Sequence, residues 1–171
     1  MTADMTKGLK IFLGVVACVA VFLILTKAYK SSPSPNSANA FEWEKQANVY
    51  FGNKNMGSSE DCSKVFPVSR TVLNAETFGP GALEALLKGV SEAEKSSGYF
   101  TSINDKVLVQ KFEIKDKVAY VDFDSRFIEG VAGSCKVMAM KSQIENTLNN
   151  LPDIDSVVVS VNGKTEGILE P

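Results

Sequence analysis

The 171-residue chain is 44% hydrophobic and 22% charged, close to the averages of globular proteins, so neither general disorder nor a polytopic membrane protein is indicated. Its length favours a single domain with a short accessory segment. The sequence contains no histidine, which excludes Ser-His-Asp and Cys-His nucleophile systems, histidine-ligated zinc and imidazole acid–base chemistry.

The net charge of −2 is distributed unevenly along the chain. Residues 1–40 carry four lysines against one aspartate, a charge of +3, which leaves −5 for the remainder. Arg70 and Arg126 are the only arginines. Binding to nucleic acid draws on clustered basic side chains. We therefore predict no nucleic-acid partner.

An uncharged apolar run at residues 11–26 predicts a membrane-spanning helix. Sixteen residues span roughly 24 Å of a hydrocarbon core about 30 Å thick, and flanking lysines extend the reach. Every face of the run is apolar, and a Ser/Pro/Asn-rich stretch follows at residues 31–40, which disfavours a buried helix of a soluble core. The predicted organisation is a cytoplasmic tail at 1–10, a transmembrane signal-anchor at 11–27, a linker at 28–46 and a folded domain at 47–171.

The orientation of this segment is not decided by charge, because two lysines flank the run on each side. A short tail before the run is typical of an uncleaved signal-anchor, which predicts that the domain lies outside the cytoplasmic membrane. Two alternatives involve processing: a lipobox-like stretch would make Cys18 a lipidated first residue, and Ala38-Asn39-Ala40 has the form of a signal peptidase site. A type IV pilin start is disfavoured by Leu13, which stands where that pattern has glutamate.

The first half of the domain contains two predicted strands, one predicted helix and one short helical turn. The strands are Ala47–Asn53 and Lys64–Leu73, and Pro67 favours an edge position or a bulge for the second. A helix follows from Pro80, ends near Gly89, and is marked by an apolar stripe of Leu83, Leu86, Leu87 and Val90. Ser91 and Glu94 form a capping box for a short second turn.

The second half begins with a hairpin in which Phe112 lies opposite Val121 and Ile114 opposite Ala119. Its turn at residues 116–117 lacks the favoured Asp-Gly, which favours a longer or bulged turn. The apolar face of the hairpin is predicted to contain Leu108, Phe112, Ile114, Ala119, Val121 and Phe123.

A second helix over residues 137–151, closed by Pro152, and a buried strand at residues 156–161 complete the order. Asn162-Gly163 then turns the chain towards Ile168 and Leu169. We predict an α+β two-layer sandwich, with a mixed sheet and both amphipathic helices on one face.

Cys62 and Cys135 are the only cysteines of the domain, and each lies in a small polar loop. If the domain is extracytoplasmic, an even pair predicts a disulfide. The alternative is two unpaired thiols in a reducing compartment. A redox or nucleophilic role would need a Cys-x-x-Cys pair or an adjacent base, and neither is present.

Two acidic pairs are the remaining candidates for chemistry, Asp122 with Asp124 and Glu92 with Glu94. The two aspartates share the outer face of a predicted strand, and no calcium-loop spacing surrounds them. A solvated surface is the favoured interpretation. We predict no catalytic residues, no metal site and no cofactor.

Seven segments of the domain together form a specific pattern: VYFGN (49–53), CSKVFPVSR (62–70), ALEALLKGVSEAEKSSGYFTSI (82–103), VAYVDFDSRF (118–127), GSC (133–135), QIENTL (143–148) and VVVSVNGKTEGILEP (157–171). In these segments the chain resembles the GerMN domain family, named after bacterial sporulation and germination proteins, and specifically the single-domain, membrane-anchored form with a cysteine pair. The resemblance implies a small fold similar to the ring-building motifs of secretion and sporulation complexes, in the cell envelope and without established catalytic residues; it does not by itself imply sporulation.

The leading hypothesis is a non-enzymatic binding or assembly module at the outer face of the cytoplasmic membrane, with a homo-oligomer or an envelope protein as partner. Edge strands at residues 65–72 and at the carboxyl end are predicted partner surfaces. The rival is a peptidoglycan-binding or peptidoglycan-hydrolysing domain. A transmembrane sensor is disfavoured because a ten-residue tail offers little for signalling.

Overall fold

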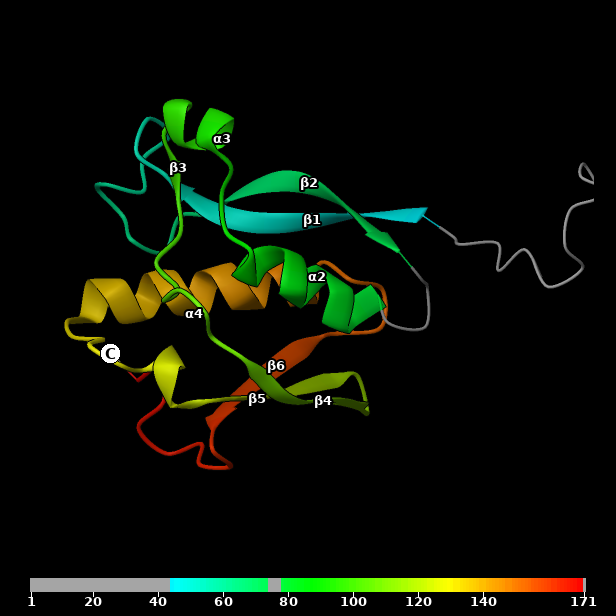
Figure 1. Ribbon diagram of the computed structural model, residues 1–171. Coiled ribbons are helices and arrows are strands. Elements are labelled where there is room, and N and C mark those ends of the chain that lie inside the picture. The colour runs from blue at the N-terminus through cyan, green and yellow to red at the C-terminus, as the bar shows by residue number, and fades with distance from the viewer. Residues whose placement is uncertain (1–43, 74–77, 171) are drawn as a thin grey trace, which may run out of the picture. The chain divides into compact units, whose positions relative to one another are not determined.

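The structure is a computed structural model that describes residues 44–73 and 78–170 (Figure 1). Its first sheet has the order β2-β1-β3. β1 (Glu44–Asn53) pairs antiparallel with β2 (Phe66–Leu73), and its other edge meets β3 (Tyr99–Phe100) at Gly52 and Asn53. β2 is an edge strand, as Pro67 predicted. β3 was missed, because two residues are too short to show an alternating pattern.

The second sheet has the order β4-β5-β6. β4 (Val109–Lys115) and β5 (Val118–Phe123) form the predicted hairpin, and β6 (Ser156–Val161) runs parallel to β5. The predicted register is confirmed, since Phe112 lies opposite Val121 and Ile114 opposite Ala119. Inward and outward faces therefore follow the sequence alternation over most of the hairpin.

The hairpin differs from the prediction at both of its ends. Asp116 and Lys117 both have positive φ, 51° and 62°, so they form a two-residue turn without glycine, and the longer turn expected there is wrong. The ladder is irregular between Val109 and Lys111. This bulge adds one residue and so breaks the alternation, which explains why Leu108, predicted to be buried, is 56% exposed.

The helices lie close to their predicted positions. α2 (Phe78–Leu87) is followed by Gly89 at φ 74°, and α3 (Glu92–Ser96) has the predicted capping box of Ser91 with Glu94. A short 3₁₀ turn, η2 (Ser125–Phe127), precedes α4 (Ser134–Asn149). α4 begins three residues before the apolar stripe that predicted it, because the amino-terminal turn contains only small and polar side chains.

The layering differs from the predicted sandwich, because the strands form two three-stranded sheets instead of one mixed sheet. Figure 1 shows α2 and α4 between the two sheets. α4 contacts both β1 and β6. α2 packs under β1 and β2, and also approaches β4: a Cβ added at Gly79 would lie 3.0 Å from the Phe112 ring. The helices are thus covered on two sides, and the α+β class holds while its single-sheet form is wrong.

The single-sheet prediction failed because α4 buries two adjacent stripes of side chains, and only one of them could be recognised in the sequence. One stripe is apolar and was predicted, and the other is polar. Thr147 Oγ1 accepts a hydrogen bond from the backbone N–H of Tyr50 in β1 (3.0 Å), and Gln143 Oε1 accepts from Thr101 Oγ1 (2.9 Å). Both polar side chains are fully buried. A prediction based on the spacing of apolar residues assigns such a polar stripe to the solvent-exposed face of the helix.

The predicted tail, anchor and most of the linker lie outside the described residues. β1 begins at Glu44, within the last residues assigned to the linker. In residues 44–73 and 78–170, no helix has the length and apolar character needed to span a bilayer.

Candidate functional site

The two aspartates singled out in the sequence serve the second sheet and the loop beside it. Asp122 Oδ1 accepts hydrogen bonds from Ser160 Oγ (2.6 Å) and from the backbone N–H of Gly163 (2.8 Å), which ties β5 to the turn after β6. Asp124 accepts from the backbone N–H of Leu108 (3.1 Å) and from Arg126 Nε. Burial acts to raise the pKa of Asp124, but these hydrogen bonds outweigh it and the pKa is lowered. A general acid would need the opposite shift.

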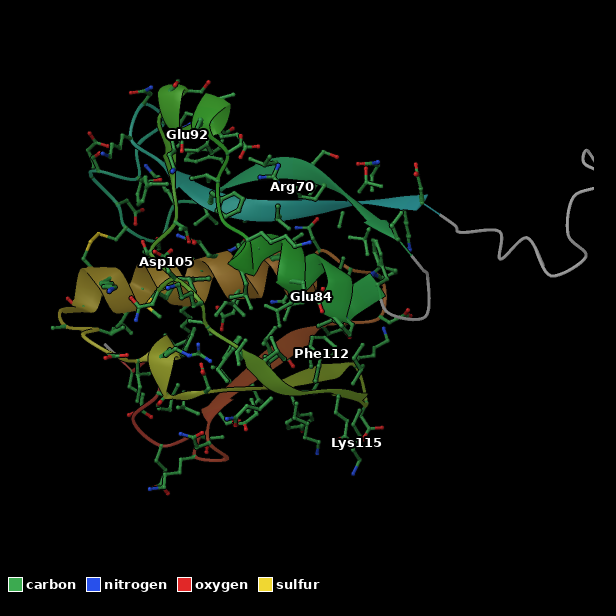
Figure 2. All side chains as sticks on the ribbon, viewed as in Figure 1. Arg70, Glu84, Glu92, Asp105, Phe112 and Lys115 are labelled. Carbon is green, nitrogen blue, oxygen red and sulfur yellow. A yellow bond between two sulfur atoms is a disulfide. The ribbon has the colours of Figure 1, made fainter. Side chains whose placement is uncertain are left out.

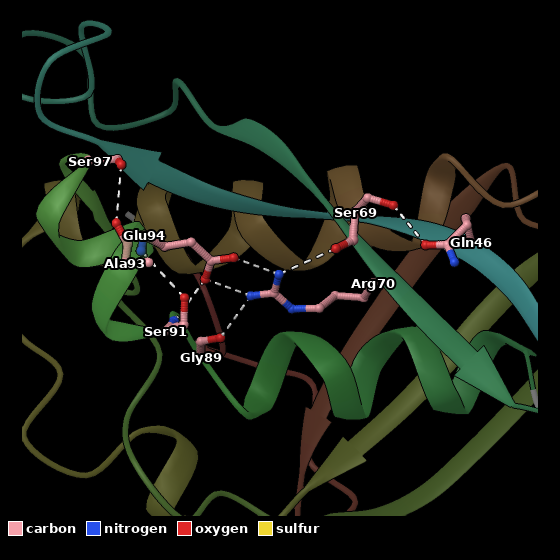
Figure 3. A network of polar contacts seen from close by, with 8 residues as sticks. All are labelled: Gln46, Ser69, Arg70, Gly89, Ser91, Ala93, Glu94 and Ser97. Atoms are coloured by element: carbon pink, nitrogen blue, oxygen red, sulfur yellow. Dashed lines mark hydrogen bonds and ion pairs between the residues drawn. The ribbon is translucent and has the colours of Figure 1, made fainter.

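The two glutamates also have separate roles. Arg70 on β2 donates two hydrogen bonds to Glu94, at 2.7 and 2.8 Å, and its Nη2 reaches the carbonyl oxygen of Gly89 at 3.4 Å (Figure 3). The Arg70 guanidinium lowers the pKa of Glu94 to about 2, with further help from the backbone N–H of Ser91. Glu92 forms a surface ion pair with Lys95 at 2.7 Å. Neither acidic pair converges on a shared site.

This contact between β2 and α3 was missed by the sequence analysis. Arg70 and Glu94 are 24 residues apart, and Arg70 falls on an alternating strand where a charged residue would normally face water. Two signals were available. Strand alternation places Arg70 on the same, more buried face as Val68 and Val72. Arg70 is also one of only two arginines in the chain, and a bidentate fork to a carboxylate is a use for which arginine is preferred over lysine.

Within residues 44–73 and 78–170, no group of three or more His, Cys, Asp or Glu side chains is arranged to hold a metal ion. The acidic candidates are each bound to an arginine, a lysine, a serine or a backbone amide. Neither of the two acidic pairs singled out in the sequence is therefore arranged as the converging, unengaged carboxylates that glycoside hydrolysis uses.

Cys62 and Cys135 form a disulfide, as the sequence predicted for an extracytoplasmic domain. Their Cα atoms are 5.4 Å apart, and 73 positions separate them in the sequence. Cys62 lies in the loop between β1 and β2, and Cys135 is the second residue of α4. The bond thus ties the first sheet to the helix that lies between the two sheets.

A hollow of about 380 Å³ lies beside the disulfide. Its lining includes both cysteines, Phe100, Ser102 and Lys136. Lys136 Nζ donates to Asn104 Oδ1 (3.0 Å), and the Asn104 amide donates to the carbonyl oxygen of Glu129 (2.7 Å). These contacts keep the rim of the hollow in place, and its one lysine is already engaged.

The predicted partner surfaces are the edges of the two sheets. β2 is an outer strand of the first sheet as far as the chain is described, and the predicted range 65–72 falls mostly within it. The carboxyl-terminal segment is less open than expected: Leu169 is buried, and Lys164 forms a bridge with Val161 at the end of β6. β4 is the other outer strand, and it was not predicted as a partner surface.

These features define a small α+β domain in which two three-stranded sheets enclose two helices and a disulfide ties the first sheet to the central helix. The family described as "Germane: Sporulation and spore germination" matches residues 48–167. That match covers well over half of the chain. The protein therefore belongs to this family, and the predicted resemblance to GerMN domains is confirmed.

Relatives of known sequence or structure agree with this assignment. Over 119 residues the chain is 33% identical to the Spore germination protein GerM of Bacillus subtilis (strain 168), covering 67% of this chain and 32% of that protein. The first GerMN domain of GerM from Bacillus subtilis matches with a TM-score of 0.55 at 19% identity, over 71% of this chain and 85% of that chain. The tandem GerMN domains match with a TM-score of 0.53 at 23% identity, over 78% of this chain and 44% of that chain.

The structural matches show a shared fold. The chain spans about a third of the length of the curated relative it matches.

Proposed function

We propose that this protein is a non-enzymatic binding or assembly module of the cell envelope, held at the outer face of the cytoplasmic membrane by the apolar segment at residues 11–27. The disulfide between Cys62 and Cys135 is the observation that carries the proposal. Structural disulfides persist in oxidising compartments and are rare in the cytosol. The bond therefore supports an outside location, which the lysine counts around the apolar segment leave undecided.

The absence of catalysis is supported by how the acidic side chains are used. Asp124 and Glu94 have lowered pKa values because of their hydrogen-bond partners, so both are ionised at neutral pH and engaged. Asp122 holds a turn beside the second sheet. With no histidine in the chain, these carboxylates were the remaining candidates for acid–base chemistry, and each has a structural role in the described part of the domain.

The location is tested by the intact mass of the full chain extracted from membranes, measured with and without reductant and after alkylation of thiols. We expect an uncleaved chain that takes one alkyl group, at Cys18, without reductant and three after reduction, because Cys62 and Cys135 are then freed. Alkylation of Cys62 and Cys135 without reductant would contradict the outside location. A mass increase at Cys18 before alkylation would show lipid anchoring in place of a spanning helix.

The competing function, binding or hydrolysis of peptidoglycan, is tested by incubating the full chain with purified sacculi. Co-sedimentation without release of soluble fragments would make the sacculus a ligand of the binding module. Release of fragments would overturn the non-enzymatic proposal. A variant with both Asp122 and Asp124 changed to asparagine serves as the control, because any hydrolysis that depends on this pair should disappear in it.

A further inference from the structure

Among the residues that the structure describes, β4 has no strand paired on its outer edge. It is the outer strand of the second sheet, and it pairs with β5 through a two-residue turn. In such a hairpin the residues flanking the turn exchange hydrogen bonds, and bonded and non-bonded pairs alternate from there. The backbone N–H and C=O groups therefore point towards β5 at Lys111, Glu113 and Lys115. Phe112 and Ile114 direct theirs away from the sheet, towards the open edge.

The side chains of β4 divide into two faces. Phe112 lies on the side of α2 and Lys115 projects away from the helices (Figure 2). The outward face carries lysine, glutamate and lysine at positions 111, 113 and 115, an alternation of positive and negative charge. Lys111 and Glu113 are 68% and 50% exposed and pair with each other at 2.7 Å. On the helix side Ile114 is 44% exposed.

This pattern is complementary to itself in one antiparallel register. When two copies of β4 meet about a two-fold axis at Phe112, Lys111 of each copy faces Glu113 of the other. Phe112 faces its own counterpart, and their outward backbone groups can exchange hydrogen bonds. Regular pairing covers residues 111–113 of each copy, and Gln110 faces Ile114 next to the bulge between Val109 and Lys111. Opposite charges directly across a strand pair are stabilising, and like charges are destabilising.

Other antiparallel registers are poorer. A two-fold axis at Glu113 would place glutamate against glutamate and Lys111 against Lys115. An axis at Ile114 keeps the opposite charges together but leaves only residues 113–115 overlapping within the strand. The charge pattern therefore selects the register centred on Phe112.

We propose that β4 pairs with β4 of a second copy of this chain, in the antiparallel register centred on Phe112, to form one continuous six-stranded sheet across a two-fold axis. The proposal deepens the assembly function proposed above by naming the partner and the surface. A two-fold contact of this kind is isologous, because each copy uses the same residues. One strand pair is a small contact, so confinement to a membrane would favour it by raising the local concentration.

The other edges fit a second copy less well. β2 contains Pro67, which lacks a hydrogen-bond donor, and proline on an edge strand is a common means of preventing pairing. Its outward residues Ser69 and Thr71 are neutral and specify no register. β6 meets its own carboxyl-terminal segment through the bridge from Val161 to Lys164.

The test uses charge reversal in the full chain. Lys111→Glu places glutamate against glutamate at both pairs of the dimer, and Glu113→Lys places lysine against lysine. Each single variant should raise the dimer dissociation constant about tenfold or more, because two pairs change sign at once. A mixture of the two variants restores opposite charges at both pairs and should dimerise as the original chain does. The double variant should do the same on its own.

Dimers are measured by co-purification of two differently tagged full-length copies from membranes over a range of protein densities. Amine-to-carboxyl cross-linking of isotope-labelled with unlabelled copies then identifies the residues joined. Lys115→Glu is the matched control, since it makes the same charge change on the same face but lies outside the pairs of Lys111 with Glu113. We expect it to leave the dimer unchanged, and a link between Lys111 of one copy and Glu113 of the other.

Monomer at every density would overturn the proposal. Equal behaviour of Lys111→Glu and Lys115→Glu would overturn the register, as would failure of the mixture to recover. A cross-link from β4 to a different envelope protein, and none to a second copy, would overturn the homodimer and identify that protein as the partner of β4. The disulfide and the location outside the membrane are tested separately by intact mass, so failure of the dimer and failure of the proposed function are distinguishable.

Discussion

The outer strands of the two sheets differ in how they are attached to the rest of the domain. In the first sheet, the outer strand β2 is tied to α3 through the double hydrogen bond from Arg70 to Glu94, and the loop before it is tied to α4 by the disulfide. In the second sheet, the outer strand β4 carries a surface ion pair between Lys111 and Glu113, and no other strand of residues 44–73 and 78–170 pairs with its outer edge. The disulfide and the double hydrogen bond of Arg70 thus lie in one half of the domain, and the accessible edge lies in the other.

The largest expected effect is in the core beneath the first sheet. Phe51 is fully buried on β1, and Phe51→Ala should lower the free energy of unfolding by about 3 to 5 kcal/mol, because it removes a large apolar side chain and leaves a cavity. Ile114→Ala on β4 is the comparison. Because Ile114 is 44% exposed, Ile114→Ala should lower the free energy of unfolding by well under half as much as Phe51→Ala does. Chemical denaturation measures both, and similar losses would contradict the difference between the halves.

The disulfide should have the next largest effect. Replacing Cys62 and Cys135 together by serine releases a loop closed across 73 positions, which should cost about 2 to 4 kcal/mol. Reduction of the original chain should lower its stability by a similar amount, whereas the double variant should be insensitive to reductant. Thermal unfolding with and without reductant measures this. A midpoint unaffected by reductant in the original chain would show that the bond contributes nothing.

Glu94 should make the stability of the domain depend on pH. Its pKa is about 2 in the folded chain and about 4.5 when unperturbed, so its contribution is fully present above about pH 5 and is lost as the pH falls from about 4.5 to about 2. We expect a loss of about 2 kcal/mol over that window from this residue. Glu94→Gln should flatten the curve. Glu92→Gln, which breaks only the exposed pair with Lys95, should not.

The smallest expected effect is a gain at the hairpin turn. Lys117 has φ 62°, a conformation that costs lysine more than glycine. Lys117→Gly creates the Asp-Gly pair that two-residue turns favour, and should raise the free energy of unfolding by about 0.5 to 1 kcal/mol. Lys115→Gly, within the strand, should lower it. A loss in the Lys117 variant would mean that its ion pair with Asp155, at 3.4 Å, outweighs the relief of strain.

Much of the local structure followed from the sequence. The register of the hairpin was predictable because Phe112, Ile114, Ala119 and Val121 alternate cleanly with charged residues. The capping box at Ser91 and Glu94 was predictable because its chemistry involves neighbours in the sequence. The candidate carboxylates were interpreted as a solvated surface. The structural partners of Asp122 and Asp124 were not predictable, because Ser160, Gly163 and Leu108 lie in other segments.

The sequence by itself therefore determined the type and order of most elements, the pairing of the hairpin and, through its resemblance, the family. Only the tertiary structure decided that the strands divide into two sheets around α2 and α4, that Arg70 is committed to Glu94, and that β4 is left as an open edge. The physical reason is visible in α4. Gln143 and Thr147 are buried because their side chains form hydrogen bonds with distant segments. A pattern of apolar residues cannot reveal a buried residue that is polar.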